Sequence, residues 1–141
     1  MQGIQGIVAY INAQMQKVTG AQVARACGMA APVAWAGGTT NSTLLAALMP
    51  PGANVQRTGA TGTFTETFDT AANIIAAYPE LDIGQTYRFT YCNVAAQTAT
   101  YTTNTGITLT GLATNAGTSL SHAIYVTKLS ATTLGIQVTN C

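Results

Sequence analysis

The chain has 141 residues, which suits one domain with a hydrophobic core and is short for two large ones. Apolar residues make up 48% of it and charged residues 6%, against about a quarter in ordinary soluble domains, which argues against disorder driven by charge. The net charge is +1 and the ions are scattered, so no basic patch indicates nucleic-acid binding. No apolar run reaches 18 residues, so no membrane-spanning helix is expected, and the lack of a signal-peptide pattern favours folding in a cytoplasm.

Residues 1–50 are predicted to form a helical attachment arm. The apolar residues of 3–18 recur at the i, i+3, i+4 spacing of an amphipathic helix: Ile4, Ile7, Val8, Ile11, Met15 and Val18. Small side chains favour a second helix over 21–31, which a proline ends. A loop over 32–38 carries the only tryptophan, and a short helix is predicted over 41–49.

Residues 51–60 are predicted to be a linker. The stretch 50–62 holds two prolines, three glycines and little hydrophobic pattern. Threonine is scarce before it and abundant after it, so we place the domain boundary near Thr61 and expect a β-module over 61–141.

The module is predicted to begin with a strand over 63–68, which has Phe64 and Phe68 on one face. Asp69 or Thr70 then caps a two-turn helix over 71–78. The helix ends at the proline that follows it.

The clearest strand covers 86–94, because large aromatic residues alternate there with polar ones. Further strands are predicted over 98–102, 107–112, 120–129 and 133–139, and turn residues separate them. Several short strands at this spacing predict a mainly β fold, an antiparallel β-sandwich or jelly-roll-like barrel with one short helix after the N-terminal arm.

Most of the module shares a pattern with known proteins. The succession TFTETFDTAANIIAAYPELDIGQTYRFTYCNVAAQTATYTTNTGITLTG, followed by AGTSLSHAIYVTKLSATTLGIQV, resembles a β-module recurrent in structural proteins of bacteriophages and large DNA viruses. The resemblance rests on the D-T-A-A-x-I-x-A-A-x-P helix, the G-x-T-x-x-F-T strand with its N-x-x-A sequel, the T-G-I-T-L-T-G hairpin and the A-G-T-S turn. It covers residues 61–138, somewhat over half of the chain.

The resemblance implies a small β-domain that trimerises on a virion exterior, as a capsid decoration or cement protein, a head fibre or a spike. We therefore expect a structural virion protein, made in the host cytoplasm, that binds the major capsid protein or another virion protein as a homotrimer. An alternative is a receptor-binding head fibre or spike domain whose loops at 104–106 and 115–118 contact a host glycan or protein. Neither a membrane nor a nucleic acid is an expected partner.

A small hydrolase is the least favoured alternative, and we expect no catalytic residues. His122 is the only histidine, with Ser119 and Ser121 nearby, but this spacing on a strand defines no catalytic triad. A surface or subunit-interface role for His122 is the favoured interpretation.

The remaining candidate groups indicate no metal or cofactor site. Glu66 with Asp69 and Glu80 with Asp82 are the only close carboxylate pairs, and we interpret them as cap and turn residues rather than glycosidase or calcium groups. The aromatic alternation in 86–94 resembles a base-stacking platform, but without surrounding cations it favours a core face. Three cysteines at wide spacing suit neither a disulfide scaffold nor zinc: Cys27, Cys92, expected to be a small buried hydrophobe, and the terminal Cys141.

Overall fold

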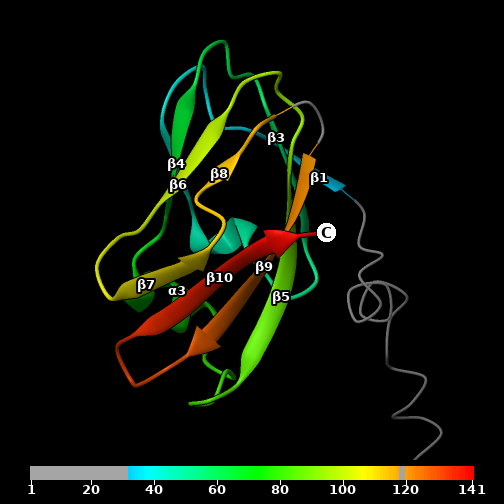
Figure 1. Ribbon diagram of the computed structural model, residues 1–141. Helices are drawn as coiled ribbons and strands as arrows, with labels where there is room; N and C mark the ends of the chain where they lie inside the picture. The colour runs from blue at the N-terminus through cyan, green and yellow to red at the C-terminus, as the bar shows by residue number, and fades with distance from the viewer. Residues whose placement is uncertain (1–31, 118–119) are drawn as a thin grey trace, which may run out of the picture.

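The computed structural model (Figure 1) describes residues 32–117 and 120–141, and every structural statement below concerns these residues. They are mainly strands, as predicted, with one α-helix and one short 3-10 helix. The elements are β1 (Pro32–Ala36), β2 (Ser42–Leu44), η1 (Ala46–Leu48), β3 (Asn54–Thr58), β4 (Phe64–Phe68), α3 (Ala71–Ala77), β5 (Thr86–Asn93), β6 (Ala99–Thr102), β7 (Ile107–Gly111), β8 (Thr114–Asn115), β9 (Leu120–Lys128) and β10 (Leu134–Asn140).

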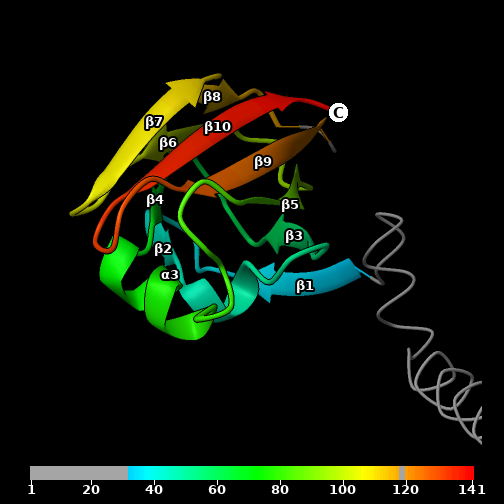
Figure 2. The ribbon, with the colours of Figure 1, turned by 90° about the horizontal axis from the view of Figure 1, so that it is seen from below.

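The strands form two sheets, a six-stranded sheet in the order β1-β3-β5-β9-β10-β7 and a four-stranded sheet in the order β2-β4-β6-β8. From β1 to β6 the chain alternates between the sheets, and each strand lies parallel to the strand of the previous turn. This part of the described chain, from β1 to β6, is therefore a two-sheet coil. The antiparallel β9–β10 pair follows it, with β7 parallel to β10 at the far edge (Figure 2).

The predicted antiparallel arrangement holds for only some of the described pairings. The β5–β9, β9–β10 and β6–β8 pairs are antiparallel, whereas β1–β3, β3–β5, β2–β4, β4–β6 and β7–β10 are parallel. Side chains alternate with the same period of two in both kinds of pairing, so the sequence pattern does not distinguish them.

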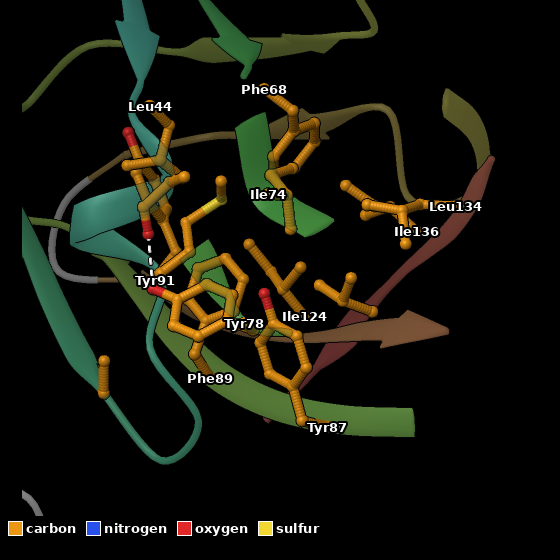
Figure 3. Packing of buried hydrophobic residues seen from close by; sticks show 14 of the residues in the cluster. Leu44, Phe68, Ile74, Tyr78, Tyr87, Phe89, Tyr91, Ile124, Leu134 and Ile136 are labelled. Carbon is orange, nitrogen blue, oxygen red and sulfur yellow. Dashed lines mark hydrogen bonds between the residues drawn. The ribbon is translucent and has the colours of Figure 1, made fainter. Parts of the chain in front are cut away.

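One apolar core lies between the sheets (Figure 3). Leu44 and Phe68 come from the four-stranded sheet, Phe89 and Ile124 from the six-stranded sheet, and Ile74 from α3; all are at most 1% exposed. Burial of each such side chain stabilises the fold by about 1.5–3 kcal/mol. The two sheets and the helix therefore depend on a shared core.

Helix α3 is confirmed close to its predicted bounds. The Thr70 hydroxyl accepts a hydrogen bond from the Asn73 amide at 3.2 Å, so Thr70 is the N-cap. Pro79 follows the C-cap residue Tyr78, whose hydroxyl donates to the Ala46 carbonyl oxygen. This bond and the burial of Ile74 fix the helix against η1 and the core.

The strands predicted over 63–68, 86–94, 98–102, 107–112, 120–129 and 133–139 are confirmed within two residues as β4, β5, β6, β7, β9 and β10. The short strand β8 was not predicted.

The predictions for residues 32–60 are wrong. The predicted loop over 32–38 contains β1, the predicted helix over 41–49 is β2 followed by η1, and the predicted linker over 51–60 contains β3. These strands belong to the same two sheets as the module predicted to start at Thr61, so the described residues show no boundary there. The prolines and glycines belong to bends between coil strands rather than to a linker. The helices predicted over 3–18 and 21–31 lie outside the described residues.

Gly111, at the end of β7, gives a test of the β7–β10 pairing. Its φ is +85°, and a Cβ there would lie 2.1 Å from the Val138 carbonyl oxygen, whereas Gly84 has a φ of +87° with open space around it. We expect Gly84→Ala to cost about 1–2 kcal/mol of unfolding free energy, from the backbone conformation alone. Gly111→Ala should cost clearly more in urea denaturation, because it adds a backbone clash; equal losses would contradict the close approach of β7 and β10.

Candidate functional site

The most densely connected polar group of the described residues lies inside the coil and centres on Arg57. Val55 and Arg57 point inward from β3, and the Arg57 side chain is fully buried. Its Nε lies 3.2 Å from Oε2 of Glu66, on β4 of the opposite sheet, and forms no hydrogen bond with it. The contact is thus a buried ion pair that joins the two sheets.

The Arg57 guanidinium is surrounded by acceptors. Its Nη2 donates to the carbonyl oxygens of Gly38 at 3.0 Å and Thr40 at 3.2 Å, and its Nη1 donates to that of Thr58. The group also lies over two aromatic rings, 5.2 Å from the centre of Trp35 and 4.7 Å from that of Phe64. These contacts replace water around a charge that would otherwise be costly to bury.

Glu66 completes the group, which we call the Arg57 cluster: Trp35, Ser42, Arg57, Phe64, Glu66 and Tyr91. The carboxylate accepts hydrogen bonds from the Ser42 hydroxyl at 2.5 Å and the Tyr91 hydroxyl at 2.6 Å. Burial raises the pKa of Glu66, and these two bonds and the Arg57 charge oppose that rise. Burial and the neighbouring Glu66 also raise the pKa of Tyr91, so its phenol stays protonated and donates. Both oxygens of the Glu66 carboxylate therefore accept hydrogen bonds from side chains of this chain.

His122 belongs to a second buried group. Its Nδ1 lies 3.0 Å from the Tyr101 hydroxyl, and the Asn115 amide donates to the same hydroxyl at 3.4 Å and to the Leu120 carbonyl oxygen at 3.1 Å. The imidazole is 3% exposed, so the expected surface or interface position is wrong: His122, Ile124 and Val126 share the inward face of β9. Among the described residues, the side chain that shares a hydrogen bond with His122 is the Tyr101 phenol, not a serine or a carboxylate. Ser119 lies outside the described residues.

Asp69 has hydrogen-bond partners different from those of Glu66. Asp69 accepts hydrogen bonds from the amides of Ala46 at 3.0 Å and Thr70 at 2.8 Å, and from the Asn73 side chain at 2.7 Å. Burial alone would raise the pKa of Asp69, but these bonds lower it below its ordinary value. Asp69 therefore fixes the start of α3 to η1, while Thr70 is the cap.

The second carboxylate pair, the aromatic residues of β5 and the cysteines were the other candidate groups. Glu80 and Asp82 are exposed near the turn before β5, and no cluster of three metal-ligating side chains occurs among residues 32–117 and 120–141. Tyr87, Phe89 and Tyr91 are buried, as expected for a core face. Cys92 is buried, as predicted, Cys141 is exposed, and neither forms a disulfide within the part of the chain that the structure describes. Cys27 lies outside the described residues.

The sequence interpretation missed Arg57 and the role of Trp35. A signal was present, because Glu66 shares an inward strand face with Phe64 and Phe68 and a buried carboxylate requires a partner.

The outer face of the six-stranded sheet carries polar side chains in regular rows. Thr86, Thr127, Gly135 and Thr108 form one row across four strands, and Arg88, Tyr125, Gln137 and Thr110 form the next. A hollow of about 280 Å³ opens on this face over β7, β9 and β10. None of the helices in the described part of the chain is long and apolar enough to cross a membrane.

A double-mutant cycle tests the ion pair. Arg57→Met and Glu66→Leu should each lower the free energy of unfolding by about 3–5 kcal/mol, because each leaves one buried polar partner uncompensated. The double variant should lose clearly less than the sum of the two, as measured by urea denaturation at pH 7. Arg88→Met, at an exposed arginine, should stay within about 0.5 kcal/mol of the wild type. Additive losses would show that the two side chains do not interact.

His122 should make stability fall on acidification. Burial lowers the pKa of His122 in the folded protein, so below the ordinary value near 6.5 the unfolded chain takes up more protons. Glu66 has the opposite sign, because its raised pKa contributes stability below about pH 4.5 that is lost as pH rises through the folded value. The difference in unfolding free energy between wild type and His122→Gln should therefore shrink from pH 8 to pH 5. A constant difference would refute a buried, neutral imidazole.

Comparisons with known proteins identify no relative. No family model matches the chain, and no curated protein and no solved structure matches it significantly. The resemblance to the viral β-module therefore stays a prediction from the motifs quoted above.

Proposed function

We propose that this chain is a structural virion protein, a capsid decoration or cement protein that binds the capsid exterior as a homotrimer. Its β-sandwich module forms the trimer, and the N-terminal segment contacts the major capsid protein or another virion protein. The observation that supports this most is the nearly uncharged outer face of the six-stranded sheet.

An uncharged polar face suits burial between subunits. Four of the eight residues in its central rows are threonines, and Arg88 is the one charged residue in them. Removing ions from water costs several kcal/mol for each ion, and the centres of protein interfaces are depleted in charge. A face of this composition becomes covered by a partner without that cost.

The proposed activity is mechanical. Each copy adds contacts between neighbouring capsid subunits, and symmetry repeats a modest contact energy over the whole shell. The proposed function uses no cofactor and no catalytic residue. The protein is made in the host cytoplasm and works on the virion surface.

The role of residues 1–31 is tested by a deletion that ends before β1. A longer deletion, up to residue 60, would remove three strands of the coil and unfold it. We expect the full chain and the shortened chain both to have trimer mass in light scattering, while only the full chain cosediments with capsids that lack the protein.

Thr90→Lys, which places a charge on the outer face of β5, should lower the mass of the assembly from that of a trimer. A full chain that is monomeric and binds no capsid would refute the proposal.

A further inference from the structure

Gly135 is a glycine that neither the backbone nor the packing requires. It lies within β10, paired with Thr127 of β9 on one side and Thr108 of β7 on the other. Its φ is not positive, and a Cβ there would meet nothing closer than Cδ1 of Leu129 at 3.4 Å, an ordinary contact. Glycine costs about 0.5–1 kcal/mol relative to alanine within a strand. Its effect here is a hollow in the outer face, where a ligand can approach the backbone closely.

The hollow has a defined lining. Its volume is about 280 Å³, and its lining consists of Thr108, Thr110, Thr127, Leu129, Gly135, Ile136 and Gln137. Gly135 contributes only backbone to the lining, and Leu129, which is 53% exposed and lies 3.4 Å from the position of a Gly135 Cβ, forms an apolar wall beside it. The volume lies just below the range of about 300–1,000 Å³ for small-molecule pockets, so it suits a small ligand.

The lining chemistry selects among ligands. None of the lining side chains is ionisable, and the nearest charge in the adjacent row, Arg88, is separated from Gln137 by Tyr125. A phosphate, a carboxylate or an amine would find no counter-charge in the hollow. Threonine hydroxyls and the Gln137 amide both donate and accept hydrogen bonds, and Leu129 provides the apolar contact.

A sugar ring combines these two properties, since it has hydroxyl groups at its edge and a carbon-bonded hydrogen face. We infer that the Gly135 hollow binds one unit of a neutral saccharide, with its apolar face on Leu129 and its hydroxyls toward Thr108 and Gln137. The site is shallow and open, so the affinity for a single unit is about millimolar. In the trimer of the proposed function, on which this one point rests, three such sites would bind a branched or repeated glycan more tightly than one site does.

Saturation-transfer difference NMR with a panel of neutral monosaccharides and disaccharides tests the inference on the full chain. We expect a subset of the panel to bind. Gly135→Thr should fill the hollow and weaken binding at least tenfold, while the melting temperature stays equal or rises, because threonine favours strands. Gly62→Thr is the matched control, because Gly62 has no positive φ and no atom within 4 Å.

Two further variants keep the test decisive. Gly135→Ala adds only the Cβ that the structure accommodates and should weaken binding less than threonine does. Leu129→Ala removes the apolar wall at a residue that follows the end of β9. It should weaken binding while the protein stays folded. If no neutral sugar binds, or if Gly135→Thr binds as the wild type does, the inference is wrong. It is also wrong if Gly135→Thr changes the mass of the assembly, because the hollow is then a contact between copies. None of these outcomes depends on capsid binding.

Discussion

The buried ion pair between Arg57 and Glu66 is the constraint on which the coil depends. Its surroundings come from five strands, because Trp35, Ser42 and Tyr91 belong to β1, β2 and β5, while the pair itself joins β3 to β4. Removing two charges from water is costly, and here three carbonyl oxygens, two hydroxyls and two aromatic rings offset that cost. A slip of β3 by one residue would turn Arg57 to the outer face and leave Glu66 without its counter-ion. The pair therefore fixes the register of the parallel strands.

The same cluster relates the low charge of the chain to its fold. Charged residues are only 6% of the sequence, yet Arg57, Glu66 and Asp69 are buried rather than used on the surface. Each has a partner in another element of the fold. Asp69 accepts a hydrogen bond from the Ala46 amide of η1, and Arg57 and Glu66 pair across the two sheets. A third of the chain's nine charged residues thus specify which turns of the coil meet.

The sequence predicted the elements with apolar alternation and missed those without it. In β5 the aromatic residues Tyr87, Phe89 and Tyr91 mark the inward face, and α3 has its cap and its terminating proline. In β3 the inward positions are Val55 and Arg57. A charged residue such as Arg57 is predicted to face outward unless its buried partner is known. His122 was misplaced for the same reason, although Ile124 and Val126 mark its face as buried. The Arg57 cluster is formed by contacts between strands, and alternation specifies neither those neighbours nor parallel pairing.

The two proposals constrain one another, because both use the outer face of the six-stranded sheet. Neighbouring threonines on this face hydrogen-bond to each other, as the Thr86 and Thr127 hydroxyls do at 2.7 Å. Because these hydroxyls need fewer bound waters, a partner that covers the face displaces less water than its composition suggests. With little charge to steer association, shape decides what binds. A trimer contact over the hollow would exclude a saccharide. The two proposals are compatible only when the proposed trimer contact lies on the β3 and β5 side of the face, near Thr90, so that the β7 and β10 side with Gly135 stays open to the proposed ligand.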